Sequence, residues 1–159
     1  MGQSAGKAGD DAKRLDAESD RPVLADRQGP FPIHQHAVQL RVRFQETDAQ
    51  GHCHHATYPN YFEVARLEML RQAGLQYRDL EESGTNLVVT DLHCQYFAPA
   101  LYDDLLTVTI RVTKTKGVRI HHEYEIHRDE ALIVKGSTVV AAVDADGNVK
   151  RLPKWLKLG

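Results

Sequence analysis

The sequence has few of the features that place a protein in a membrane or outside the cell. Its 159 residues contain no apolar run near the roughly 20 residues of a membrane-spanning helix, and no apolar leader near the N-terminus. Only two cysteines are present, Cys53 and Cys94, which is too few for a disulfide framework. A formal net charge of −2 gives no broad attraction to nucleic acid or anionic lipid. We therefore expect a cytoplasmic protein with no nucleic-acid partner and no membrane span.

Residues 1–34 and residues 35–159 differ in composition. The first segment is rich in glycine, alanine, aspartate, lysine and arginine, with three prolines toward its end. It offers too little apolar area to offset the entropy of ordering it, so we predict a disordered or loosely attached tail. The rest of the chain is long enough for one domain, and a hydrophobic content of 42% is enough for a core. The predicted domain covers residues 35–159.

The period of the apolar residues indicates a strand followed by a long helix. From Val38 to Phe44 every second residue is apolar, as in a half-buried strand. Helical spacing then relates Tyr58, Phe62, Ala65, Met69 and Ala73. Thr57 is the predicted N-cap of this helix, and Gly74 its predicted end.

Four further strand patterns follow, after a short helical segment near residues 76–83. They cover about 86–97, 106–113, 118–127 and 132–143, and Gly136 is a predicted bulge in the last of them. In the third pattern His121 and His122 fall on opposite faces. A strand, a long helix and four strands joined by short turns predict an α+β domain, with an antiparallel sheet covering one helix.

The loop between the first strand and the helix is rich in reactive side chains. Within residues 46–55 it holds Glu46, Asp48, one thiol and three imidazoles. Unpaired N–H groups and a partial positive charge mark the start of a helix, where they can stabilise an oxyanion. A carboxylate placed just before such a start can attack a carbonyl or activate water. The loop therefore suits acyl transfer, although this spacing also occurs in ordinary loops.

Several separated motifs carry a family resemblance. The sequence reads RFQETDAQGH at 43–52, HATY at 55–58, YFEVAR at 61–66, YFAPA at 96–100, YDDLL at 102–106 and RLP at 151–153. In this order they resemble the 4-hydroxybenzoyl-CoA thioesterase family, most closely its branch of small acyl-CoA thioesterases associated with the Tol-Pal system. The resemblance covers roughly residues 37–154.

The resemblance implies a fold and an activity. The family has the hotdog fold, a long central helix wrapped by a five-stranded antiparallel sheet. Its subunits pair through their sheets into homo-oligomers, dimers or tetramers, with active sites between subunits. The implied reaction is hydrolysis of an acyl-CoA thioester to a carboxylic acid and CoA. No cofactor is implied, because coenzyme A is part of the substrate.

The resemblance also assigns site residues. Asp48 would be the nucleophile or general base, and the backbone N–H of His55 would bind the thioester oxygen. Gly51 permits the turn between them, and Tyr58 contributes to the substrate site and the core. Basic side chains would hold the CoA phosphates: Lys114, Lys116 and Arg119.

Other interpretations of the same residues remain open. Asp48 could be a turn residue, and Glu46 fits a solvated loop position. The cluster at 52–55 could bind zinc together with His93 and Cys94, but its spacing matches no zinc motif. Cys53 fits a small, partly buried side chain better than a nucleophile. No metal site is therefore predicted.

Other functions also remain open. A non-catalytic module that binds acyl-CoA or acyl-carrier protein is one, and a hotdog dehydratase is another. A third is a structural partner that docks a membrane-associated complex. The chain departs from the family pattern at His52, Cys53 and His54, where apolar or aromatic residues are usual. We expect this departure to make the pocket mouth more polar and to affect acyl preference.

Overall fold

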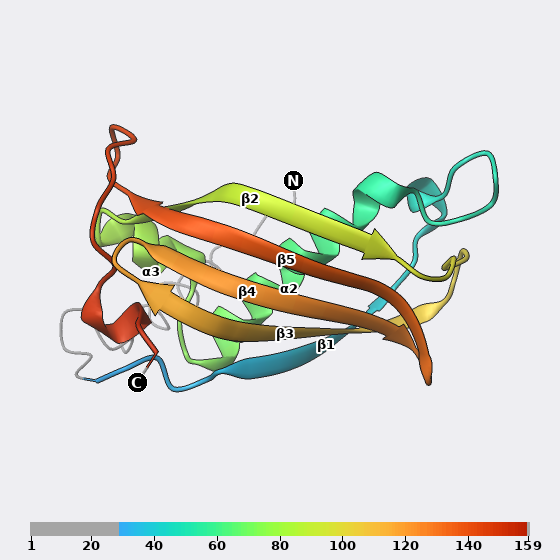
Figure 1. Cartoon of the computed structure of the whole chain (residues 1–159), viewed down its shortest axis with the longest axis horizontal. Helices are drawn as coiled ribbons and strands as arrows, with labels where there is room; N and C mark the ends of the chain where they lie inside the picture. The colour runs from blue at the N-terminus through green and yellow to red at the C-terminus, as the bar shows by residue number, and fades with distance from the viewer. Residues whose placement is uncertain (1–28, 159) are drawn as a thin grey trace, which may run out of the picture.

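The computed structural model describes residues 29–158. Its elements are β1 (Gln35–Arg41), η2 (Phe44–Glu46), η3 (His55–Thr57), α2 (Tyr58–Gln72), α3 (Tyr77–Glu82), β2 (Asn86–Tyr96), β3 (Leu105–Lys116), β4 (Arg119–Arg128), β5 (Ala131–Val143) and η4 (Lys154–Leu156). The five strands form one sheet in the order β1-β3-β4-β5-β2, and every neighbouring pair is antiparallel. The long helix α2 lies against one face of this sheet (Figure 1). The predicted α+β hotdog architecture is confirmed.

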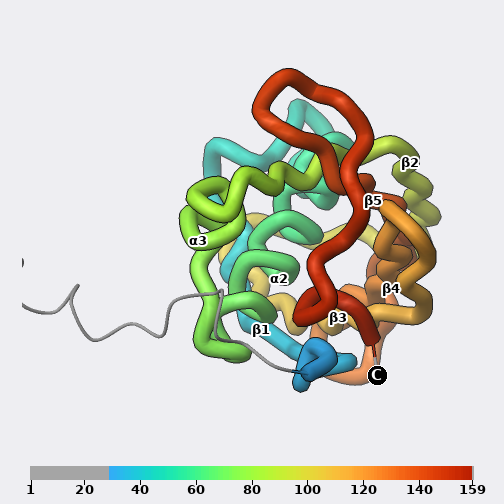
Figure 2. Tube along the Cα trace, turned by 90° about the vertical axis from the view of Figure 1, so that its left-hand side faces the viewer, coloured from blue at the N-terminus to red at the C-terminus, as the bar shows by residue number. Residues whose placement is uncertain are grey.

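The predicted apolar face of α2 forms the centre of the core. Phe62 and Ala65 are fully buried, and Tyr58, Met69 and Ala73 are nearly so. The helix packs mainly against β1 and β3, as the end-on view of Figure 2 shows. Beyond the helix, Gly74 has a φ of +74°, in keeping with its predicted place at the helix end.

Gly136 lies in regular pairing with Cys94 on β2 and Tyr124 on β4, so its predicted bulge is wrong. The bulges fall elsewhere, at Thr90, Thr113 and near Ile133. A Cβ atom on Gly136 would stand 2.4 Å from the Phe62 ring. The glycine is therefore explained by the close approach of the helix to the sheet, and not by strand geometry.

The first strand ends earlier than its apolar alternation predicts. β1 ends at Arg41, and the chain then turns into the 3-10 helix η2. Phe44, predicted to face inward, is 76% exposed and meets Tyr102 edge-on, with ring centroids 5.7 Å apart. The turn into η2 places Glu46, and not Phe44, inside the protein.

Strand β2 forms one edge of the sheet and carries exposed apolar side chains. Its neighbour β5 pairs with one side of it, and no other described strand pairs with the opposite side. Partly exposed along β2 and just after it are Val88, Val89, Leu92, Tyr96 and Phe97. Unpaired edges of this length are templates for pairing with another strand.

Most of the predicted tail, residues 1–28, lies outside the described residues. Of its last residues, Phe31 is 5% exposed, packs into the core and donates its N–H to the Lys157 carbonyl at 2.8 Å. Within residues 29–158, no helix has the length and apolar content needed to cross a bilayer.

Candidate active site

The loop that carries Asp48 is a short hairpin. Thr47 pairs with Cys53, and the Asp48 N–H donates to the His52 carbonyl at 2.9 Å. The tip closes when the Gly51 N–H donates to the Asp48 carbonyl at 2.9 Å, with Gly51 at a φ of +76°. Gly51 thus permits the turn, as predicted, and does so in the left-handed conformation, which costs other residues free energy.

The carboxylate of Asp48 has one oxygen engaged and one open. Its Oδ1 accepts the Gln50 N–H at 2.9 Å, an Asx-turn contact within the hairpin tip. Its Oδ2 has no hydrogen-bond or ion-pair partner among the described residues. The side chain is therefore oriented by the turn and keeps an oxygen available to a substrate or a water.

The long helix α2 is preceded by the 3-10 helix η3, which bears on catalysis. Thr57 is the N-cap residue of α2, as predicted, but its side chain makes no capping hydrogen bond there. The side-chain cap belongs to the preceding 3-10 helix η3, where Nδ1 of His54 accepts the Ala56 N–H at 3.1 Å. The Thr57 N–H donates to the His54 carbonyl at 2.9 Å. In the described part of the chain, the His55 N–H has no such acceptor. It is the donor of this first turn that remains for a ligand.

Tyr96 ties the helix start to the edge strand β2. Its hydroxyl donates to the His55 carbonyl at 2.9 Å. Its ring meets the Tyr58 ring at a centroid distance of 5.7 Å. Tyr58 itself is 2% exposed and belongs to the core, so a substrate group reaches it only beside Tyr96 or through a shift of side chains.

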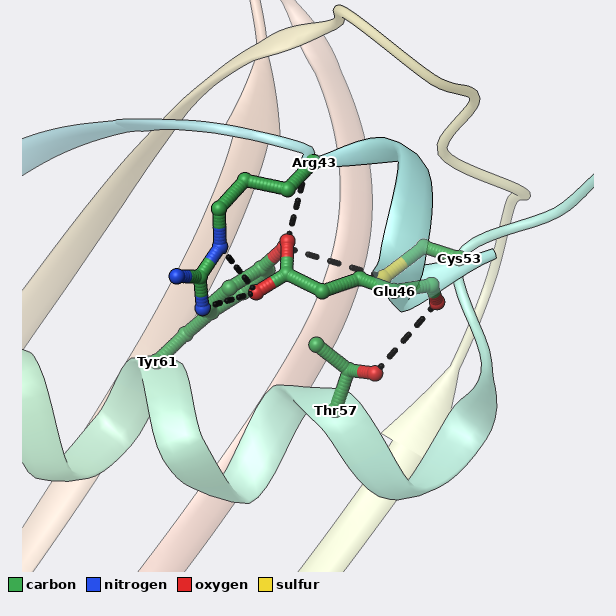
Figure 3. Close-up of polar contacts among 5 residues, drawn as sticks. All are labelled: Arg43, Glu46, Cys53, Thr57 and Tyr61. Carbon is green, nitrogen blue, oxygen red and sulfur yellow. Dashed lines mark hydrogen bonds and ion pairs between the residues drawn. The ribbon is translucent and has the colours of Figure 1, made fainter. Parts of the chain in front are cut away.

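Glu46 is the residue that sequence reasoning missed. Its side chain is 8% exposed and accepts four hydrogen bonds (Figure 3). Arg43 donates through its backbone N–H at 2.8 Å, its Nε at 2.9 Å and its Nη2 at 2.7 Å, and the Tyr61 hydroxyl donates at 2.7 Å. The Glu46 carbonyl accepts the His54 N–H at 2.8 Å and so fixes the helix cap. The predicted solvated loop position is wrong, because Glu46 forms the rigid base of the hairpin.

The electrostatics of this base keep Glu46 charged. Burial alone would raise the pKa of its carboxyl, but the hydrogen bonds from Arg43 and Tyr61 outweigh burial and hold the pKa below its ordinary value. Burial, and then the bond to Glu46, raise the pKa of Tyr61, which stays a neutral donor. The sequence held one signal of this network, the i,i+3 spacing of Arg43 and Glu46.

The other side chains of the cluster are arranged for structure. Cys53 is buried beside the Tyr61 hydroxyl, with Sγ 3.8 Å away, and burial raises the pKa of its thiol. A raised pKa disfavours the thiolate, which agrees with the structural interpretation of Cys53. The rings of His54 and His55 stack at 4.2 Å. Among residues 29–158, no three His, Cys, Asp or Glu side chains converge as metal ligands would.

The basic side chains predicted to bind the CoA phosphates lie at the end of the sheet opposite the Asp48 loop. Lys116 pairs with Arg119 at the β3–β4 turn, and Lys114 precedes them on β3. The Asp48 loop follows Arg41, which pairs with Leu105 at the opposite end of β3. Eleven residues of strand separate the two ends, about 35 Å. One chain does not bring these groups to Asp48, and only a second copy could.

The chain is similar to known thioesterases. Residues 42–158 match the model of the thioesterase-like superfamily. The chain is 39% identical to the acyl-CoA thioesterase YbgC of Haemophilus influenzae, over 74% of this chain and 88% of that protein. It is 31% identical to the acyl-CoA thioester hydrolase YbgC of Escherichia coli O6:H1, over 66% and 79%. The crystal structure of the DHNA-CoA thioesterase from Staphylococcus aureus superposes with a TM-score of 0.72 at 31% identity, covering 76% of this chain and 82% of that one.

Proposed function

We propose that this chain, which belongs to the thioesterase-like superfamily and is an acyl-CoA thioester hydrolase, uses Asp48 as its catalytic carboxylate and the His55 N–H as its oxyanion donor. The observation that carries the proposal is the pairing of an open carboxylate oxygen with an open N–H at the start of α2. Asp48 lies in the hairpin and His55 begins η3 just after it, and Glu46 contacts both segments through its hydrogen bonds to Tyr61 and to the His54 N–H.

The proposed reaction begins with the thioester oxygen at the His55 N–H. As the carbonyl carbon becomes tetrahedral, negative charge grows on that oxygen, and the N–H and the helix dipole stabilise it. Asp48 then acts in one of two ways. It attacks the carbonyl to give a mixed anhydride that water hydrolyses, or it takes a proton from the attacking water. CoA leaves as the thiol in both routes, and the acid is released.

This assignment needs no cofactor and no metal, and we propose that the enzyme uses neither. Full activity after prolonged treatment with EDTA is the expected result. Loss of activity that zinc restores would instead favour the cluster at 52–55 as a metal site. The predicted cytoplasmic location belongs to the same proposal and is tested by cell fractionation.

The two rival activities predict different products. A dehydratase would convert a 3-hydroxyacyl thioester to an enoyl thioester, which absorbs in the ultraviolet, whereas the proposed enzyme releases a thiol. Dehydratase chemistry also requires a catalytic His with a carboxylate on the partner's helix. Asp48 instead precedes the helix. A non-catalytic binding module would leave the thioester intact for hours.

We further propose that two copies pair through β2. Its outer edge is unpaired among the described residues, and its apolar side chains are partly exposed. Because a two-fold axis makes β2 antiparallel to its copy, the Asn86 end of one copy lies near the Tyr96 end of the other. Such pairing is the one arrangement here that could bring Lys114, Lys116 and Arg119 toward the Asp48 of a second copy. Light scattering should give twice or four times the chain mass, and a monomer would contradict the pairing.

The central test replaces Asp48 with Asn. The amide oxygen can still accept the Gln50 N–H, so the hairpin is kept while the charge is lost. We expect kcat to fall by about 10³-fold, within the range that a positioned acid or base contributes, with KM and thermal stability little changed. Thiol release from a panel of acyl-CoA substrates measures the effect.

A matched control is Asp129→Asn. Asp129 is also a turn aspartate; it is exposed and has a φ of +50°, in the β4–β5 turn. Its replacement should leave kcat within about twofold. Near wild-type kcat for the Asp48 variant on every substrate would remove Asp48 from the mechanism.

A further inference from the structure

A largely apolar cavity of about 370 Å³ lies between the second half of α2, the start of β2 and the inner face of the sheet. Its walls include Leu67, Leu70, Leu87, Val140 and Leu156. Since a water molecule occupies about 30 Å³ in the liquid, the space holds about a dozen non-hydrogen atoms. Cavities of this size and lining are typical of sites for small organic groups.

Four lining residues carry polar groups: Glu63 and Arg66 on α2, Tyr77 on α3 and His122 on β4. Arg66 and His122 belong to one hydrogen-bond network. Arg66 Nη1 donates to the Tyr124 hydroxyl at 3.0 Å, and that hydroxyl lies 2.9 Å from the Thr138 hydroxyl. The Thr138 hydroxyl in turn lies 3.5 Å from Nδ1 of His122. The network fixes both polar groups at the cavity wall and leaves the His122 Nε2 without a partner among the described residues.

Arg66 has no ion-pair partner among residues 29–158, although Glu63, three residues earlier on α2, lines the same cavity. The described ion pairs join other residues, and no carboxylate among residues 29–158 lies within 4.0 Å of its guanidinium. One of its five N–H donors is used by Tyr124. A half-buried guanidinium beside an apolar wall loses hydration, which an anion in the cavity would offset.

His122 can donate a hydrogen bond to an anion bound at Arg66. It is 7% exposed, and burial, followed by the charge of Arg66, lowers its pKa to about 3. The imidazole is therefore neutral near pH 7. A neutral ring can donate one N–H to a bound carboxylate.

The cavity opens at two exposed lining residues, one on α2 and one on β2. Glu63 and Val89 line the cavity and are also exposed, so they mark where it opens. Glu63 lies in the second turn of α2, close to the N-terminal end of the helix. Arg66 is eleven residues beyond His55, a rise of about 16 Å, and helical side chains lean toward the N-terminus, which shortens the gap. An acyl chain of medium length can span it.

We propose that this cavity is an acyl pocket selective for acyl groups that end in a carboxylate, with Arg66 binding that carboxylate and His122 donating to it. The inference rests on the proposed function, because the thioester must sit at His55 and Asp48. A carboxylate and a guanidinium form two parallel hydrogen bonds, which gives selectivity over a methyl end as well as affinity.

The test compares octanoyl-CoA with suberoyl-CoA, whose acyl chains have equal length but end in a methyl group and a carboxylate. We expect wild-type kcat/KM to favour suberoyl-CoA by tenfold or more. Arg66→Met should lower kcat/KM at least tenfold on suberoyl-CoA and by less than threefold on octanoyl-CoA. Arg66→Lys, which keeps the charge but not the paired geometry, should fall between. Arg71→Met is the matched control on the exposed side of the same helix and should change neither substrate.

Three outcomes would overturn the proposal. Wild type could hydrolyse octanoyl-CoA as well as or better than suberoyl-CoA. Arg66→Met could lower kcat/KM equally on both substrates, which would assign Arg66 a general structural role. Alternatively, Arg66→Met and Glu63→Gln could weaken dimer association to the same extent. That result would make Glu63 of a second copy the counter-ion of Arg66. In each case, hydrolysis of octanoyl-CoA that depends on Asp48 would leave the proposed function intact. If no substrate were hydrolysed in an Asp48-dependent way, the proposed function would be wrong as well.

An NMR titration distinguishes loss of carboxylate binding from misfolding of the variant. Suberate alone, titrated into the wild-type protein, should shift the His122 imidazole signals in NMR spectra. Octanoate should shift them much less. Folded Arg66→Met protein, with an unchanged melting temperature, should lose the suberate response. Equal shifts with both acids would contradict selectivity.

Discussion

Glu46 and Asp48 are two residues apart in one loop, yet their carboxylates have opposite environments. Glu46 is 8% exposed, and its oxygens accept four hydrogen bonds from Arg43 and Tyr61. Asp48 is half-buried and accepts one recorded bond, from the Gln50 N–H. A carboxylate whose lone pairs are all engaged cannot attack a carbonyl or take a proton. The difference assigns structure to Glu46 and leaves Asp48 for chemistry.

The largest effect within this comparison should come from Glu46→Gln. It removes the charge that Arg43 and Tyr61 bind, and the amide cannot accept all four hydrogen bonds. We expect the free energy of unfolding to fall by about 2 kcal/mol, because hydrogen bonds to buried charged groups are lost. Urea unfolding measures it. A variant as stable as wild type but inactive would reverse the roles of the two carboxylates.

The same variant should change how stability depends on pH. The pKa of Glu46 is lower in the folded protein than in the unfolded chain, so its contribution is fully present above the unfolded value. It is lost as pH falls through the folded value. The unfolding free energy of wild type should therefore drop more steeply below about pH 4 than that of Glu46→Gln. Tyr61→Phe, which removes one donor, is the milder control.

A smaller effect should follow Gly51→Ala, which acts on the Asp48 side of the loop. Gly51 has a φ of +76°, and no atom lies within 4 Å of an added Cβ, so the cost is conformational and about 1 kcal/mol. Gly147→Ala, at a φ of +83° and equally open, should cost the same stability. Only the Gly51 variant should lower kcat, because its strain shifts the turn that orients Asp48. Equal kcat in both variants would show that this turn does not position Asp48.

Regular structure was readable from the sequence because it depends on local periods. The spacing from Tyr58 to Ala73 located α2, and alternation located β3, β4 and β5 closely. The prediction from local period was wrong at Phe44, because the apolar alternation continues there although the strand ends at Arg41. It failed again at Gly136, because a glycine in a strand reports either a bulge or a close neighbour, and Phe62 is 74 residues away in the chain.

The candidate site was predictable in its members but not in their roles. The motif order singled out Asp48, Gly51 and His55, which the structure joins in one hairpin and helix start. Residue preference assigned the N-cap position of α2 to Thr57 correctly, but the side-chain capping bond is made three residues earlier, by His54 at the start of η3. The basic residues of the β3–β4 turn cannot be judged within one chain, since their distance from Asp48 depends on a second copy.

By itself the sequence determined the elements, their order and the loop that holds the reactive groups, because those follow from periods of two and 3.6 residues and from motifs close together in the chain. Only the tertiary structure decided which carboxylate is engaged and which is open. Glu46 is held by Tyr61, fifteen residues away on α2, and Arg66 meets the β4 residue Tyr124 beside a cavity lined by residues of seven separate elements. Whether a polar group is paired depends on which partners folding brings to it, and no local pattern records that.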